Sequence, residues 1–342
     1  MTSGNTAGKP PPDELERMLG ELQRAADLTV PYALRTAVTL GLAEELAAGP
    51  RKLPELAEAV GAQQAGVHKV VRVLANEGFF ELQDDTVSLA ARGWVLLEGI
   101  AHARLDHRRG YSRIDDGWPG LLHTVRTGKS GFEHVRGRSF WAELATDETL
   151  VASFDEQLAQ WMARWAVASV EVLPITAGNV VDVGGGIGRL LAQILRARPE
   201  TTGTLVDLPS TAARAEQLFA EHGLTERTTI AAQSFFEPLP SGGVLYLLAQ
   251  VLHDWPDAES VAILRRVAEA AGDAPIVLIE RLTGDVGDHV AIDLLMHVLF
   301  GAGERSEQEF AALATQAGLT LVSTRPILDG LSAIELRRHP ER

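Results

Sequence analysis

The chain of 342 residues contains no cysteine. Disulfides, zinc–thiolate sites and iron–sulfur clusters are therefore excluded from its structure. No apolar run approaches the length of a membrane span, and residues 1–12 lack the hydrophobic segment of a secretory signal. We therefore expect a cytoplasmic protein that does not interact with membranes.

Positive charge is also scarce. Lys and Arg number 31 against 46 Asp and Glu, so the formal net charge is −15. A chain of this charge is repelled by nucleic-acid phosphates and by anionic lipids, which argues against both as partners. The length allows a large core and about two domains. Residues 1–12 are small, polar and proline-rich, and predict a disordered leader.

The most informative stretch covers residues 179–189. Valines fill residues 180–183 except for Asp182, and leucine and isoleucine return at helical spacing in residues 190–195. Between them, residues 184–188 include four glycines. The order strand, glycine turn, helix predicts a site where a ligand lies against bare backbone and the free amides of a helix start.

Charge indicates which ligand this turn binds. Asp207 follows Gly188 by 19 residues, the distance expected of an acid that binds a ribose at the end of the next strand. A dinucleotide would bring its pyrophosphate close to Asp182, and Arg189 occupies the position of the usual third glycine. S-adenosylmethionine carries an ammonium and a sulfonium instead. We therefore favour S-adenosylmethionine over a nicotinamide cofactor.

A second feature follows the apolar strand at residues 244–248. His253 and Asp254 fall just beyond its end, where open α/β sheets place their ligands. A histidine there can act as a general base. Alternatively, it is a loop residue before a helix at residues 258–271, with Asp257 as the N-terminal acid of that helix.

These segments together resemble the S-adenosylmethionine-dependent small-molecule O-methyltransferases of the plant caffeate type and their bacterial natural-product relatives. Residues 182–188 resemble the first cofactor motif, residues 207–209 the ribose acid, residues 234–240 the adenine-side segment and residues 253–255 the catalytic-base motif. Glu280, residues 293–296 and residues 301–306 resemble the acid and substrate-side segments. The resemblance extends from about Thr29 to the C-terminus.

The resemblance implies a role for each matching residue. His253 would be the base, held by Glu280 and Glu304, and Asp254 and Met296 would lie on the substrate side. The implied cofactor-binding residues are Asp182, Gly184, Gly186, Asp207, Leu208, Ser234 and Phe235.

The residues alone also allow structural roles for both glutamates. Glu280 could form a salt bridge with Arg281, and Ser306 with Glu309 could form a capping box at the start of a helix. We expect no metal, because the acids are dispersed along the sequence without ligand spacing.

The N-terminal half contains a winged helix-turn-helix pattern at residues 53–89. Its second helix has only Lys69 and Arg72 as cations, which are too few for the phosphate contacts on which DNA binding relies. In the resembled family this module serves dimerisation, so we expect a homodimer. Farther along, Trp161, Met162 and Trp165 could together line a pocket for a flat aromatic substrate, although such residues are individually more often core.

The expected fold is α/β, with a Rossmann-like methyltransferase domain built on a doubly wound, mostly parallel sheet and a mainly α-helical N-terminal winged-helix dimerisation domain. The expected divisions are a leader at 1–12, a dimerisation domain at 13–105, a helical linker and substrate-pocket segment at 106–172 and a catalytic domain at 173–342.

The expected activity is methylation of a hydroxyl on a small, aromatic or polyketide natural product. One alternative is an enzyme that uses the cofactor for hydroxylation, decarboxylation or pericyclic chemistry. Another is a cofactor-sensing winged-helix regulator.

Overall fold

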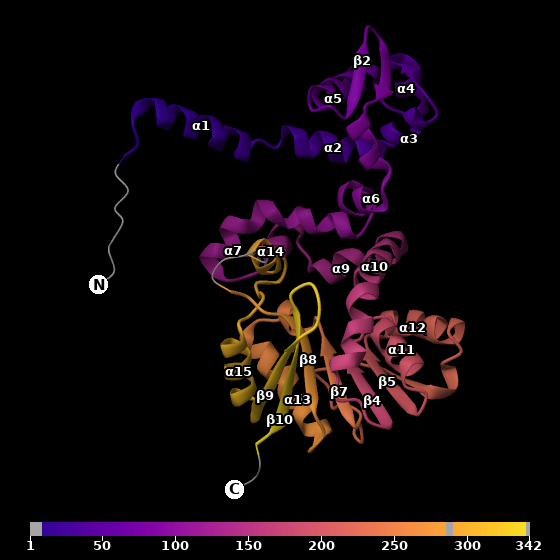
Figure 1. Ribbon diagram of the computed structural model, residues 1–342, viewed down its shortest axis with the longest axis vertical. Coiled ribbons are helices and arrows are strands. Elements are labelled where there is room, and N and C mark those ends of the chain that lie inside the picture. Colours follow the sequence, from indigo (N-terminus) through magenta and orange to yellow (C-terminus); the bar gives the residue numbers. More distant parts are fainter. Residues whose placement is uncertain (1–8, 285–289, 340–342) are drawn as a thin grey trace. The chain divides into compact units, whose positions relative to one another are not determined.

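The computed structural model describes residues 9–284 and 290–339. The chain forms two compact units, one that extends to Ser112 and one that begins at Arg113 (Figure 1). Part of the expected leader, residues 1–8, lies outside the described residues, and the first helix begins at Pro12. Residues 106–172 were expected to form a linker between two domains. In the structure, residues 113–172 belong to the second compact unit.

The first unit contains short helices and a small sheet. Its elements are α1 (Pro12–Ala26), α2 (Thr29–Leu40), α3 (Leu42–Ala47), β1 (Arg51–Lys52), α4 (Leu53–Ala59), α5 (Gln64–Asn76), β2 (Phe80–Gln83), β3 (Thr86–Leu89), η1 (Ala91–Leu97) and α6 (Gly99–Leu105).

The expected helix pair and wing are both present in this unit. Helices α4 and α5 precede the antiparallel hairpin β2–β3, which turns at Asp84 with a φ of 54°. Val67, Val71 and Leu74 lie at helical spacing on α5 and are buried in the core of the unit. The sheet order is β1-β3-β2.

The second unit contains the large sheet and the remaining helices. Its elements are η2 (Tyr111–Gly120, which begins before the division), α7 (Leu121–Thr127), α8 (Gly131–Arg136), α9 (Phe140–Leu144), α10 (Glu148–Val172), β4 (Gly178–Val183), α11 (Arg189–Ala197), β5 (Thr201–Asp207), α12 (Pro209–Glu221), η3 (Thr225–Arg227), β6 (Thr228–Ala232), β7 (Leu245–Ala249), η4 (Leu252–Asp254), α13 (Asp257–Ala271), β8 (Ile276–Arg281), α14 (Val290–Phe300), α15 (Glu307–Gln316), β9 (Leu319–Pro326) and β10 (Leu331–Arg338).

The large sheet has seven strands in the order β6-β5-β4-β7-β8-β10-β9. The first five in that order run parallel, and β10 and β9 add an antiparallel hairpin at one side. The chain order reverses between β4 and β7, so the loops after these two strands meet at a topological switch point. Open α/β sheets bind their ligands at this place. The expected doubly wound, mostly parallel sheet is confirmed.

Alternating strand residues divide the core of this unit into two layers. Val181 packs on one face with α13 and α15, whereas Val180 packs on the opposite face with α10, α11 and α12 (Figure 1). Because parallel strands are buried on both faces, they read as continuous apolar runs. No helix among the described residues is long and apolar enough to span a membrane.

Candidate active site

The turn after β4 requires glycine for two separate reasons. Gly184, Gly186 and Gly188 have φ values of 69°, 60° and 80°, which disfavour other residues. At Gly185 the obstacle is space, since an added Cβ would lie 2.4 Å from Oδ2 of Asp182 and 2.5 Å from Cδ1 of Leu205. A Cβ on Gly186 would meet nothing within 4 Å, so this position of the turn faces open space.

Asp182 lies directly beneath this turn and is completely buried. Neither of its carboxyl oxygens has a hydrogen-bond partner among the described residues. Burial, with a further contribution from the charge of Asp207, raises the pKa of Asp182 to about 7. A buried carboxylate without a donor is costly, and a cationic ligand would offset that cost.

Asp207 ends β5 and closes the glycine turn. Its Oδ2 accepts a hydrogen bond from the amide of Gly186 at 2.8 Å, and its Oδ1 accepts one from the amide of Leu208 at 2.7 Å. Burial raises the pKa of this carboxyl, while the two backbone donors act in the opposite direction. Each carboxylate oxygen can accept a second bond, so the group can still bind a hydroxyl.

The remaining expected cofactor residues lie on both sides of the turn. Leu208 is exposed at the start of α12. Ser234 accepts a hydrogen bond from the amide of Phe236, which shapes the loop after β6. An added Cβ on Gly184 would lie 3.4 Å from the ring of Phe235 and 3.0 Å from Val251. The glycine turn is therefore in contact with the segment that leads to His253.

His253 lies in η4, just beyond β7, with its side chain 13% exposed. Its Nδ1 is 3.0 Å from Oε1 of Glu304, and its Nε2 is 3.4 Å from Oδ1 of Asp254. Burial acts to lower the pKa of His253, but these carboxylates outweigh it and raise the pKa to about 10. Burial in turn raises the pKa of Asp254 to about 6.

Glu280, the penultimate residue of β8, is completely buried and binds the backbone next to the base. Its Oε1 accepts from the amides of Val251 and Leu252 at 3.1 and 2.8 Å, and its Oε2 accepts from the side-chain amide of Gln250 at 3.2 Å. Gln250 has a φ of 56°, an unfavourable conformation that these bonds stabilise. Burial raises the pKa of Glu280 to about 7.

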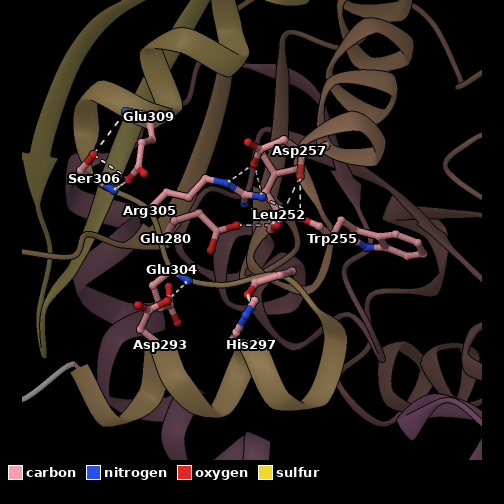
Figure 2. Close-up of polar contacts among 12 residues, drawn as sticks. Leu252, Trp255, Asp257, Glu280, Asp293, His297, Glu304, Arg305, Ser306 and Glu309 are labelled. Atoms are coloured by element: carbon pink, nitrogen blue, oxygen red, sulfur yellow. Dashed lines mark hydrogen bonds and ion pairs between the residues drawn. The ribbon is translucent and has the colours of Figure 1, made fainter. Parts of the chain in front are cut away.

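Glu304 binds the imidazole ring and is itself held by α14. Its amide donates to Oδ1 of Asp293 at 2.9 Å (Figure 2), while its buried Oε2 has no partner among the described residues. Met296, expected on the substrate side, lies partly buried on the same helix. The capping box expected at Ser306 and Glu309 is also present, so this segment combines a helix start with a site residue.

Arg305, which the sequence analysis gave no role, is buried beside the base. Its Nη1 donates to the carbonyl of Leu252 at 2.8 Å and its Nη2 to the carbonyl of Trp255 at 2.7 Å. It also bonds Oδ1 of Asp257 through Nε and Nη2 at 3.0 and 2.9 Å (Figure 2). In the sequence, the one indication of a role for Arg305 is its position directly after Glu304, an expected site residue.

The acids that are dispersed in the sequence meet in space. His253, Glu280 and Glu304 each offer a ligand-type atom, and these atoms lie within 4.8 Å of one another. Dispersal along the sequence therefore does not separate these groups in space, and the absence of a metal stays a prediction.

The expected aromatic wall does not form one surface. Trp165 is buried, 7% exposed, in the core layer that contains Val180 and Leu190. Met162 packs at the edge of that layer, whereas Trp161 is 43% exposed on α10. Trp161 and Trp165 lie on the same side of α10 but one turn apart, and the helix enters the core layer at Trp165 and continues in it through Ala166 and Val170.

Comparison with known proteins agrees with this geometry. Residues 118–320 match the family model of the O-methyltransferase domain, and residues 23–99 match that of the O-methyltransferase dimerisation domain. The chain is 39% identical over 312 residues to 2,7-dihydroxy-5-methyl-1-naphthoate 7-O-methyltransferase of Streptomyces carzinostaticus, covering 90% of this chain and 94% of that protein. It is also 34% identical over 317 residues to aclacinomycin 10-hydroxylase of Streptomyces purpurascens, covering 89% and 85% of the two chains.

A solved structure shows the same architecture. The O-methyltransferase from neocarzinostatin biosynthesis, in complex with S-adenosylmethionine and 2-hydroxy-5-methyl naphthoic acid, has a TM-score of 0.86 and 37% identity. The match covers 93% of this chain and 98% of that one. The chain therefore belongs to the family of S-adenosylmethionine-dependent O-methyltransferases.

Proposed function

We propose that this protein methylates a hydroxyl group of a small aromatic natural product, with His253 as the general base. The observation that carries the proposal is the contact between Nδ1 of His253 and Glu304 at 3.0 Å, in a turn adjoining the glycine turn of β4. The similarity to an enzyme that methylates a dihydroxynaphthoate supports an aromatic acceptor.

The residues around the glycine turn fit the family cofactor. Asp182 offers a buried carboxylate with no hydrogen-bond partner in the described part of the chain, Gly186 faces open space, and Asp207 retains acceptor capacity. We assign these three residues to the cofactor, together with Gly184, Leu208, Ser234 and Phe235. When bound, S-adenosylmethionine supplies a methyl group activated by its sulfonium.

The protein's own part in the reaction is to generate and hold the nucleophile. With Nδ1 hydrogen-bonded to Glu304, the neutral imidazole presents Nε2, on the side of Asp254, to take the proton of the acceptor hydroxyl. The imidazolium that forms is stabilised by Glu304 and by Asp254. Asp254 and Met296 are assigned to the acceptor side, as are Trp161 and Met162, while Trp165 supports α10 from the core.

We further propose that the cluster of His253, Glu280 and Glu304 works without a metal ion. Three N–H groups already donate to the carboxylate of Glu280, two to Oε1 and one to Oε2. Glu280 is therefore poorly placed to act as a metal ligand. Dialysis against EDTA should leave the activity unchanged. Loss of activity that a divalent ion restores would contradict this proposal.

Replacing His253 by glutamine tests the base. Folded His253→Gln that binds S-adenosylmethionine with wild-type affinity should lose most turnover with a phenolic acceptor, because general acid–base catalysis contributes about 10²- to 10⁴-fold. Turnover close to that of the wild type would refute the role of His253.

The product pattern separates methyl transfer from the hydroxylation known in one relative. Stoichiometric S-adenosylhomocysteine and methylated acceptor indicate methyl transfer. A hydroxylated product without S-adenosylhomocysteine would favour the second activity.

A further inference from the structure

We propose that Arg305 is a positioning residue for the general base, a role that rests on the proposed function of His253. The guanidinium side chain is only 8% exposed and bonds the turn that carries His253 at two carbonyl oxygens. One of them, the carbonyl of Leu252, belongs to the peptide group that immediately precedes His253.

Arg305 and Glu304 hydrogen-bond His253 and the backbone next to it at different points. Glu304 bonds the imidazole ring. Arg305 bonds the backbone on both sides of this histidine, at Leu252 and Trp255 (Figure 2). Because the two residues are neighbours in the chain, one peptide unit holds their Cα atoms about 3.8 Å apart, so the bond to the ring and the bonds to the backbone come from adjacent points of one segment. The torsion angles of the His253 side chain are thereby restricted.

Glu304 and Arg305 are themselves held by hydrogen bonds to other elements. The amide of Glu304 donates to Asp293 of α14, and the carbonyl of Arg305 accepts from the amide of Thr283 at 3.1 Å, just beyond β8. Asp257 at the start of α13 bonds the guanidinium from the other side. Helices α13 and α14 and the segment after β8 therefore all bond the Glu304–Arg305 segment, α13 through the guanidinium and the other two through the backbone.

Arg305 also complements Glu280. Glu280 accepts from the amides of Val251 and Leu252, and Arg305 donates to the carbonyl of Leu252, so both polar groups of Leu252 bond buried charged side chains. A lysine cannot reproduce this pattern, because its ammonium is a compact point charge without the planar fork of a guanidinium. The geometry thus requires arginine rather than a positive charge alone.

The test compares Arg305→Lys with a matched control, Arg265→Lys. Arg265 also lies on the second unit and donates to a backbone carbonyl, that of Gln316 at 3.0 Å, but it is exposed and remote from the turn. We expect Arg305→Lys to lower kcat by about 10- to 100-fold, as a small displacement of a reacting group does. The Kd for S-adenosylmethionine should stay unchanged, and Arg265→Lys should behave as wild type.

Nitrogen-15 NMR of histidine-labelled protein supplies a readout that a purely structural role would not move. The imidazole signals of His253, assigned by their absence in His253→Gln, should change in position and pH dependence in folded Arg305→Lys. Unchanged His253 signals or an unchanged kcat in folded Arg305→Lys would overturn the proposal.

His253→Gln, assayed beside the other variants, separates the two proposals. If it retains wild-type turnover, the proposed base fails. If it is inactive while Arg305→Lys retains wild-type kcat, only the role of Arg305 fails.

Discussion

His253 lies between two carboxylates, and these set the pH range in which the residue can accept a proton. Asp254 and Glu304 raise its pKa to about 10, against the opposing effect of burial. Below that pKa the imidazole is mostly protonated and cannot act as a base, so kcat/KM should rise as the pH increases through the neutral range.

Removing one carboxylate should move this rise in a known direction. Asp254→Asn eliminates a negative charge 3.4 Å from Nε2 and lowers the pKa of His253, so the rise in kcat/KM should shift to lower pH. Asp273→Asn removes the same charge at an exposed site beyond α13 and serves as the control. Superimposable pH profiles for Asp254→Asn and wild type would contradict the assignment.

Replacing Glu280 should mainly lower the stability of the protein, whereas replacing Glu304 should mainly lower its turnover. Glu280→Ala leaves the buried amides of Val251 and Leu252 without an acceptor, at a cost of about 1–3 kcal/mol for each group. Glu304→Ala removes one bond to the imidazole, worth about 0.5–1.5 kcal/mol, but should reduce kcat strongly. Urea denaturation at pH 5 and steady-state kinetics measure the two effects.

The stability difference caused by Glu280 should also depend on pH. Burial raises its folded-state pKa from 4.5 to about 7, so its contribution to stability is fully present below the unfolded value and is lost as the pH rises through 7. The deficit of Glu280→Ala should therefore be larger at pH 5 than at pH 8. A deficit that grows with pH would show that the carboxylate is stabilised rather than strained by its surroundings.

At the scale of elements, the glycine turn and the strand beneath it behave as one unit. A Cβ at position 185 would collide with Asp182 and with Leu205, so Gly185→Ala should lower stability by about 1–3 kcal/mol, as overpacking does. Truncating Asp182 to alanine removes one of the two obstacles. A double-mutant cycle should therefore give a coupling energy of about 0.5–3 kcal/mol between the two positions. Strict additivity would contradict the packing described.

The elements around this turn were predictable because each leaves a local pattern. Residues 180–183 form a buried parallel strand and read as an apolar run, and the glycines mark the turn that follows. The sequence carries no comparable local pattern that shows which group a given side chain will contact. Glu280 was expected to hold the imidazole but holds the backbone beside it, and Arg305 had no expected role at all. Both contacts join segments about 30 to 50 residues apart, which strand and helix periodicity does not encode.

Helix α10 shows the same limit for packing. Its aromatic residues indicated a surface rich in large side chains, yet their spacing did not show that Trp165 faces the sheet while Trp161 remains exposed. The contacts in space divide the chain after Ser112, whereas the sequence predicted divisions after residues 105 and 172. Residues 148–172 form a long helix in either arrangement, and the packing of Trp165, Ala166 and Val170 in the core layer beside the sheet joins it to the second unit.

At the scale of the whole molecule, the first unit leaves apolar side chains uncovered. Helix α1 has no buried residue, and Met18 and Leu22 on it are 43% and 62% exposed. Residues 23–99 match a dimerisation domain and begin directly after Leu22, and exposed apolar side chains of this kind mark a surface that a second copy can cover. We therefore propose a homodimer, whose mass light scattering after size-exclusion chromatography would measure.

A charge placed on this surface should weaken that dimer. Burying one leucine contributes about 1.5–3 kcal/mol, so Leu22→Glu should raise the dimer dissociation constant by at least about tenfold if α1 lies at the interface. Val322→Glu is the matched control, because Val322 is 56% exposed on β9 in the second unit, close to the 62% of Leu22. Both variants should still bind S-adenosylmethionine, since the cofactor residues belong to the second unit. A Leu22→Glu protein that dimerises as tightly as Val322→Glu would place the interface elsewhere on the chain.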